Sequence, residues 1–197
     1  MAVGLLLGAA SHLGDELHHS WAAIANIGGP WVASAFWAGS GARSATRGML
    51  RGAGALVVAL VAYYATKRLL DPGPIALDLL RRDGPYWLIL AAVAGPLFGL
   101  LGARWRSGKG WRRSVPVALL GGALVAEGLR VPTLFFPGVA TTVTATLEIL
   151  AGLTAAWALG PRDLRARTLV VTLGAAAAAY LAMDRVREAL GSFRFTP

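Results

Sequence analysis

Long apolar runs, separated by short polar segments, dominate this chain of 197 residues. The runs are about 16 to 22 residues long, close to the roughly 20 residues that a transmembrane helix needs. Within the runs, apolar residues do not alternate with polar ones as they would in the strands of a membrane barrel. Only helices and closed barrels satisfy their backbone hydrogen bonds in lipid. The pattern therefore predicts an all-α, polytopic bundle of transmembrane helices.

We predict a single integral membrane domain with about seven spans, or six if the short first run is not a full span. The approximate limits are 2–17, 21–39, 50–67, 85–103, 114–134, 139–159 and 168–184. Gly28, Gly29 and Pro30 fall inside the predicted second span, where the proline is expected to bend the helix. Trp87 and Trp105 flank the predicted fourth span, as residues of an interfacial aromatic belt do.

The net charge of +9 does not indicate a nucleic-acid partner, because the basic residues lie in short clusters between the apolar runs. The loops after the second, fourth and sixth spans carry three, five and three Lys or Arg residues. The positive-inside rule places these loops and the N-terminus in the cytoplasm, and the C-terminus outside. Arginine outnumbers lysine 17 to 2, which favours a high-GC bacterial source and hence the inner (plasma) membrane.

Two carboxylates at matched depth are the sharpest feature of the sequence. Glu127 precedes the Pro137-Gly138 turn signal by 10 residues, and Glu148 follows it by 10. At 1.5 Å per residue both would lie roughly 15 Å below the turn, near the middle of a ~30 Å hydrocarbon layer. Ionisable residues inside a membrane usually mark a pathway or a binding site. We therefore predict a substrate-binding polar centre at Glu127 and Glu148.

Structural interpretations of the two glutamates remain open beside the functional one. Arg130 lies three residues after Glu127 on the same helical face, so the two could form an internal pair. Alternatively, Pro132 ends the fifth span and Glu127 reaches toward water from the last turn. If both carboxylates share one cavity, leaving both ionised is costly. We then expect a proton, Arg130 or a bound cation to neutralise the pair.

Other polar residues add weaker candidates for the same centre. Thr144 shares one helical face with Glu148 and would extend the polar stripe, although threonines also bond their own helix. Asn26 could bind a polar ligand or join two helices by a hydrogen bond. Gly95, Gly99 and Gly102 favour close helix packing over a binding role.

A polar turn rich in histidine and acid follows the first run. His12, His19 and either Asp15 or Glu16 share a helical face, and imidazole with carboxylate suits a divalent metal. The spacing matches no specific metal motif, so we assign no metal and no cofactor. The chain has no cysteine, which removes disulfides and thiolate chemistry. No nucleophile and base can be assembled from these residues, which disfavours an enzyme.

Four segments carry a resemblance to a known family: NIGGPWVASAFWAG (26–39), the basic loop after it, AGPLFGLLG (94–102) and LLGGALVAEGLR (119–130). In these the chain resembles small actinobacterial multi-pass membrane proteins grouped as a domain of unknown function. The resemblance implies a membrane-embedded helical fold over most of the chain. It implies no activity, substrate or catalytic residue.

Two functional classes follow from these observations. The first is a membrane protein that binds or transports a small polar or cationic solute, with the lipid bilayer around it and no nucleic acid. The second is a non-transporting protein whose glycine-rich faces and basic loops assemble with a partner membrane protein.

Overall fold

The computed structural model describes residues 2–16, 27–70, 84–134 and 138–191. These residues form α1 (Ala2–Asp15), α3 (Gly29–Ser40), α4 (Ala45–Leu70), α6 (Gly84–Ser107), α7 (Trp111–Leu134), α8 (Val139–Leu159) and α9 (Arg165–Gly191), with a short 3-10 helix, η1 (Arg162–Leu164), before α9. No strand occurs in these ranges. The prediction of an all-helical fold is confirmed.

Five of the described helices are long and apolar enough to cross a membrane, as a multi-pass membrane protein requires. The five segments are Ala45–Leu70, Trp87–Ser107, Trp111–Thr133, Val139–Leu159 and Arg162–Met183. Helices α1 and α3 have 14 and 12 residues, and at 1.5 Å per residue each falls short of a ~30 Å hydrocarbon layer. The residues between them, 17–26, lie outside the described part.

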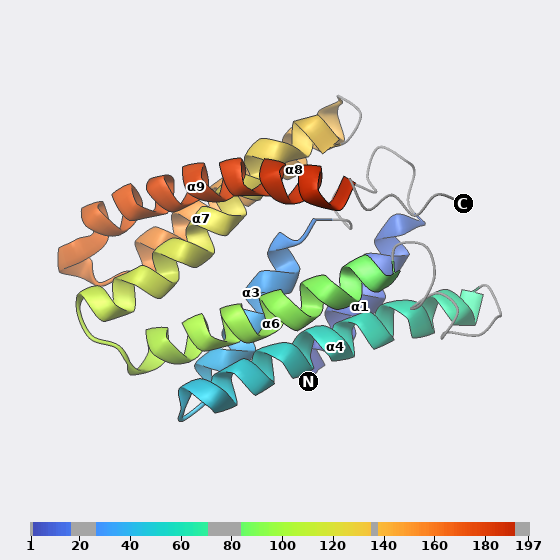
Figure 1. The fold of residues 1–197 in the computed structure, drawn as a ribbon, viewed down its shortest axis with the longest axis horizontal. Coiled ribbons are helices and arrows are strands. Elements are labelled where there is room, and N and C mark those ends of the chain that lie inside the picture. Colours follow the sequence, from blue (N-terminus) through green and yellow to red (C-terminus); the bar gives the residue numbers. More distant parts are fainter. Residues whose placement is uncertain (1, 17–26, 71–83, 135–137, 192–197) are drawn as a thin grey trace.

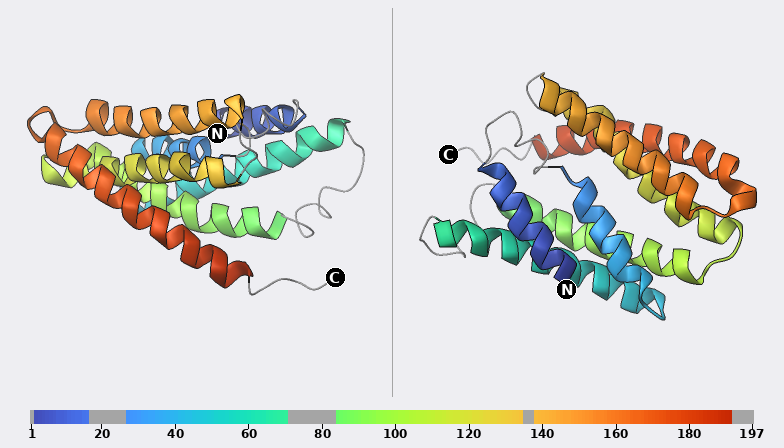
Figure 2. Two further views of the ribbon diagram at one scale, coloured as in Figure 1. Left: turned by 90° about the horizontal axis from the view of Figure 1, so that it is seen from above. Right: turned by 180° about the vertical axis from the view of Figure 1, so that it is seen from behind.

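The helices form two groups that lie side by side (Figure 1). One group holds α7, α8 and α9, with α7 packed against both of the others. The other holds α1, α3, α4 and α6, in which α1 lies on α4 while α3 packs on both α4 and α6. Seen from behind, α1 and α3 cover the same side of α4 and α6 (Figure 2). Contacts of α6 and α3 with α7 join the two groups.

Glycines allow α3, α4 and α6 to approach one another at backbone distance. A Cβ added at Gly99 would lie 2.3 Å from the carbonyl oxygen of Gly48, and one at Gly102 would lie 1.9 Å from that of Phe36. Small residues at such crossings are typical of membrane helices, where close backbone approach replaces a hydrophobic driving force. Gly95 likewise lies against Gly52 and Ala53 on α4. The glycine faces predicted to pack are thus used within the chain.

Trp105 lies in the largest apolar cluster, which joins α3, α4, α6 and α7. Its ring lies 5.7 Å from that of Phe36, and its Nε1 donates a hydrogen bond to the carbonyl of Leu159, 3.2 Å away. The side chain is only 6% exposed, so placing it in an interfacial belt was wrong. The indole is buried because α3 and the end of α8 pack over it.

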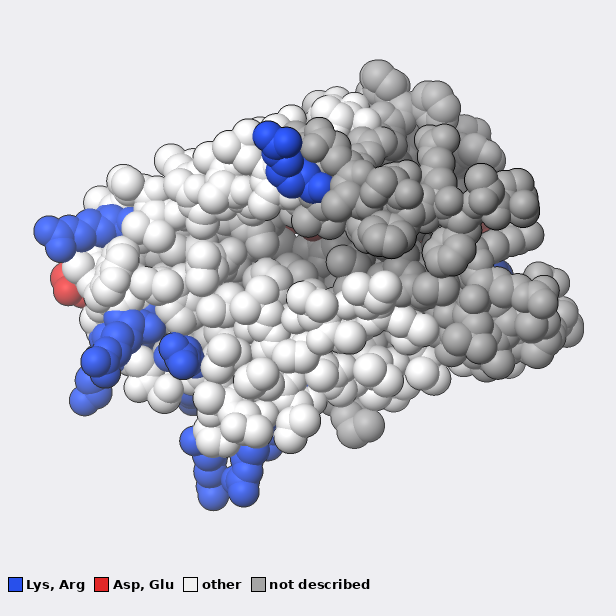
Figure 3. Space-filling model, in the orientation of Figure 1, with Lys and Arg blue, Asp and Glu red and all other residues white. Residues whose placement is uncertain are grey.

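Basic residues gather at one end of the bundle. The α3–α4, α6–α7 and α8–α9 connections all lie at the left end in Figure 1. Most of the Lys and Arg residues visible in Figure 3 lie at this end. The three basic loops of the sequence therefore face the same side, which is the arrangement that the positive-inside rule needs. Figure 3 also shows a hollow between the two helix groups, with a small area of acidic atoms at its floor.

Candidate functional site

Glu148 lies on the inner face of α8 and is 5% exposed. Thr144, one turn earlier on the same face, is also buried, and its hydroxyl donates to the carbonyl of Ala140 at 2.8 Å. This local bond satisfies the hydroxyl proton and leaves only acceptor capacity on the threonine oxygen. The two residues thus place acceptors, and no donor, on the buried face of α8.

Glu127 lies on α7 and caps the N-terminus of α3. The backbone N–H of Gly28 donates a hydrogen bond to Glu127 Oε1, and Gly29 N–H also interacts with this carboxylate. The first N–H groups of a helix have no partner within it. Gly28, the N-cap residue, has no side chain to supply one. A carboxylate is favoured there because it meets the positive end of the helix dipole.

The lack of side chains at Gly28 and Gly29 makes room for both carboxylates. A Cβ added at Gly29 would lie 2.2 Å from Glu148 Oε1 and 2.4 Å from its Oε2. A Cβ added at Gly28 would lie 3.2 Å from Glu127 Oε1. The start of α3 therefore inserts between the two glutamates. Neither glycine was predicted to belong to the site, although the Gly-Gly-Pro run is visible in the sequence.

Pro30 does not bend a helix, so that prediction was wrong. Helix α3 begins at Gly29, which places Pro30 in its first turn. Proline is tolerated there because its missing N–H would have no partner within the helix. Helix α3 is thus a short helix that starts inside the bundle. Its 12 residues reach about 18 Å from the basic end, roughly halfway through a hydrocarbon layer.

Arg130 contacts α9 in the structure. Its Nη1 donates to the carbonyl of Tyr180 on α9 at 3.3 Å, and its guanidinium carbon lies 5.5 Å from the centre of the Tyr180 ring. Among the described residues no ion pair joins Arg130 to Glu127, so the interpretation of an internal pair was wrong. Successive turns of α7 face different neighbours, with Glu127 toward α3 and Arg130 toward α9.

The interpretation that Glu127 reaches toward water from the last turn of its helix was also wrong. Helix α7 continues to Leu134 with Pro132 inside it, so Glu127 is seven residues from the end. The side chain is partly buried and bonded to α3. Asn26 falls outside the described residues.

The two carboxylates differ in how well they are satisfied. Glu127 accepts from the backbone of α3, whereas Glu148 Oε2 is buried without a hydrogen-bond partner. The pair is close enough to interact electrostatically. An unsatisfied, charged oxygen in such a site is destabilising, because neither water nor a donor replaces its lost hydration. The arrangement can therefore accept a proton or a cation.

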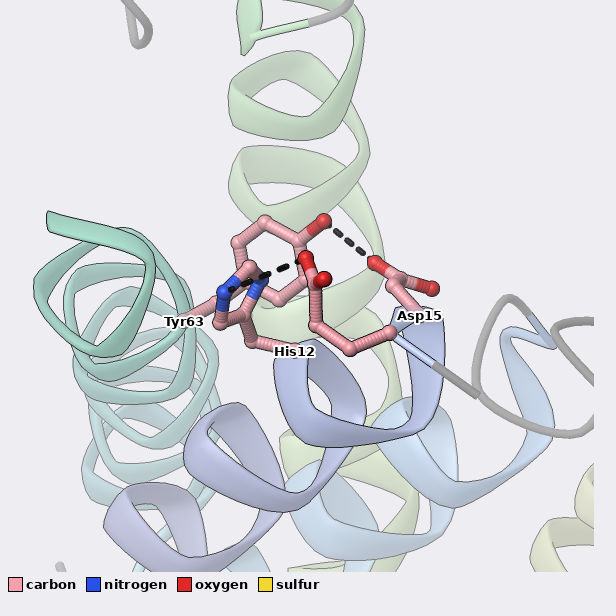
Figure 4. A network of polar contacts seen from close by, with 4 residues as sticks. His12, Asp15 and Tyr63 are labelled. Atoms are coloured by element: carbon pink, nitrogen blue, oxygen red, sulfur yellow. Dashed lines mark hydrogen bonds and ion pairs between the residues drawn. The ribbon is translucent and has the colours of Figure 1, made fainter. Parts of the chain in front are cut away.

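A second polar cluster joins α1 to α4 (Figure 4). Tyr63 donates a hydrogen bond to Asp15 Oδ2, and the His12 ring lies edge-on to Tyr63 at 5.2 Å. His12 is 3% exposed, and its Nε2 lies 3.9 Å from Glu16 Oε1. In the described ranges no three His, Asp or Glu side chains are grouped to hold a metal ion. His19 lies outside these ranges.

A family model described as a family of unknown function, DUF6518, matches residues 1–191. The chain belongs to this family. The match confirms the resemblance to a family without an assigned function, and the actinobacterial source stays a prediction. Membership in DUF6518 brings no substrate or catalytic residue to the site. No curated protein and no solved structure matches the chain.

Proposed function

We propose that this protein binds a small cation, a proton included, at the Glu127–Glu148 centre within the membrane. One observation carries the proposal: the Glu148 carboxylate is buried with one oxygen unpartnered, beside a second carboxylate. Ionisable groups inside a membrane are expensive and usually line a cavity or a pathway. A carboxylate kept there without a donor is best explained by a positively charged occupant.

The charge around the pair supports a cationic occupant. The N-terminus of α3 contributes about half an elementary charge, which offsets only part of the charge of one carboxylate. Arg130 is directed to Tyr180 on α9. Two ionised carboxylates close together in a low-dielectric site repel each other, and each has lost hydration. One further positive charge would bring the centre close to neutrality.

The short helix α3 favours a transport role over simple storage. Many membrane transporters bind their ions near the midplane, at the ends of discontinuous helices. Here the N-terminus of α3 meets Glu127 and Glu148 about halfway across the bundle. We propose that α1 and α3 lie within the bilayer beside the five longer helices. With the basic loops in the cytoplasm, the N-terminus is inside and the protein belongs to the plasma membrane.

The alternative of assembly with a partner protein has less support. Its main argument was the glycine-rich faces, and Gly95, Gly99 and Gly102 contact α3 and α4 of the same chain. No described feature points to a particular partner.

Cation-dependent stability tests the proposal. The protein is purified in detergent and freed of small ions. Its unfolding is then measured with and without sodium or methylammonium chloride at fixed ionic strength, and separately over a range of pH. A ligand that binds only the folded state stabilises it by about 2.7 kcal/mol at 100 times its Kd. We expect stabilisation of the parent and its loss in Glu148→Gln. Asp163→Asn, which removes an exposed carboxylate at the basic end, is the matched control and should respond like the parent.

Native mass spectrometry of the same preparation shows whether a small cation co-purifies. The proposal fails if added cations and a lower pH stabilise the parent no more than they stabilise the Glu148→Gln variant. Equal stability and equal retention of any ligand in both proteins would make the glutamates structural.

A further inference from the structure

We propose that the two glutamates have different tasks: Glu127 holds the N-terminus of α3, and Glu148 is the residue that binds the cation. This inference rests on the proposed function and assigns the charge of the occupant. Only one carboxylate is available to it, so the site takes a cation with a single positive charge, such as a proton, sodium or a primary ammonium.

The first step is the commitment of Glu127 to α3. Its Oε1 accepts from Gly28 N–H, and Gly29 N–H interacts with the same carboxylate. These backbone donors belong to a helix that lacks a side-chain cap of its own. Capping bonds of this kind stabilise a helix. Turning Glu127 toward a ligand would leave the donors unsatisfied inside the bundle, which opposes that movement.

The second step concerns Glu148, whose carboxylate is confined by its neighbours but is not fully hydrogen-bonded. Gly29 lies directly against its carboxylate, so the side chain is confined on that side by the α3 backbone. Its Oε2 nevertheless has no hydrogen-bond partner. Thr144, on the same buried face, has already donated its hydroxyl proton to Ala140 and can only accept. A positively charged donor or ion is the partner that such an acceptor set lacks.

The third step concerns the charge of the occupant. Divalent calcium takes six to eight oxygen ligands, usually with several carboxylates, and magnesium requires near-octahedral geometry. One free carboxylate supplies a single negative charge, which matches a singly charged cation and falls short of the several carboxylates that calcium usually takes. Ionisable groups on the helices packed against α8 include Glu127 and Arg130 of α7 and Tyr180 of α9. Glu127 is bonded to α3, and Arg130 contacts Tyr180, so neither supplies the missing ligand.

Three variants of the detergent-purified protein separate the two tasks: Glu148→Gln, Glu127→Gln and Glu127→Ala. The unfolding midpoint is measured with sodium chloride, methylammonium chloride or magnesium chloride at constant ionic strength, and between about pH 5 and 8. We expect Glu148→Gln to weaken binding of singly charged cations at least 100-fold. Glu127→Gln keeps an oxygen for Gly28 N–H and should bind within 10-fold of the parent. Glu127→Ala removes the cap and should lose binding together with stability.

The outcomes distinguish this inference from the proposed function. Equal loss of binding in Glu127→Gln and Glu148→Gln, or magnesium bound more tightly than sodium, refutes the division of tasks but leaves a cation site. If neither the cations nor the pH affect the unfolding midpoint of the parent, both the inference and the proposed function are refuted. If the occupant is a proton, added salts have no effect, and Glu148→Gln reduces the pH dependence of the midpoint more than Glu127→Gln does. Should Glu148→Gln fail to fold, Gly29→Ala, which displaces the same carboxylate, takes its place.

Discussion

Replacing Gly29 with alanine tests the geometry of the candidate site with a single methyl group. Gly29 opens α3 in an ordinary helical conformation, so alanine is compatible with the backbone there. The added Cβ would lie 2.2, 2.4 and 2.6 Å from Oε1, Oε2 and Cδ of Glu148. Restoring a normal separation of about 3.5 Å requires the carboxylate to move by about 1 Å. The methyl group therefore takes the place that the carboxylate now occupies.

The expected cost to folding is small. Overpacking a filled site costs about 1–3 kcal/mol. The displaced atoms are the end of a flexible side chain, so the lower part of that range applies. Replacing a helical glycine also stabilises by about 0.4–1 kcal/mol through the unfolded chain. We expect a net loss of about 0–1.5 kcal/mol in the free energy of unfolding, with at least a 10-fold loss of cation binding.

Two other glycines are matched controls for the same substitution. A Cβ at Gly102 would lie 1.9 Å from the backbone oxygen of Phe36, which cannot swing aside, so Gly102→Ala should cost about 3 kcal/mol or more. Gly54, inside α4, has no atom within 4 Å of the added Cβ, and Gly54→Ala should be neutral or stabilise by up to about 1 kcal/mol.

Unfolding of each variant in detergent, followed by circular dichroism with and without sodium or methylammonium chloride, gives both quantities. The reasoning is refuted if Gly29→Ala binds the cation as tightly as the parent, because cation binding would then not depend on the position of the Glu148 carboxylate. It is also refuted if Gly102→Ala is as stable as Gly54→Ala, since the helix contacts would not be as close as described.

Two further predictions concern α1 and the orientation. Tyr63→Phe removes the hydroxyl that donates to Asp15, which should lower the free energy of unfolding by about 1 kcal/mol. Thermal unfolding in detergent measures this value. An unchanged free energy of unfolding would mean that the bond does not hold α1 to α4. The chain has no cysteine, so single cysteines introduced at Ser107 and at Ser192, which lies outside the described residues, report the topology. In intact spheroplasts an impermeant thiol reagent should label the cysteine at Ser192 and not that at Ser107, and the reverse pattern would invert the orientation.

Much of the architecture was predictable from local sequence. A run of about 20 apolar residues has few alternatives in lipid, so the all-helical class follows from run length alone. The clustering of the basic loops at one end follows from helices that alternate in direction. Glu127 and Glu148 were predicted to form a polar centre because their spacing from Pro137-Gly138 places them at similar depth.

Tertiary structure decided which groups meet at that depth. Gly28 and Glu127 are 99 residues apart in the chain, and nothing in the spacing of either predicts their hydrogen bond. Helical periodicity allowed a pair of Arg130 with Glu127, but in the structure Arg130 contacts Tyr180 on α9. Periodicity fixes the face of a helix on which a side chain lies, whereas the neighbour on that face depends on how the helices are arranged. Likewise, the space that Gly28 and Gly29 leave for the two carboxylates exists only because α3, α7 and α8 meet there.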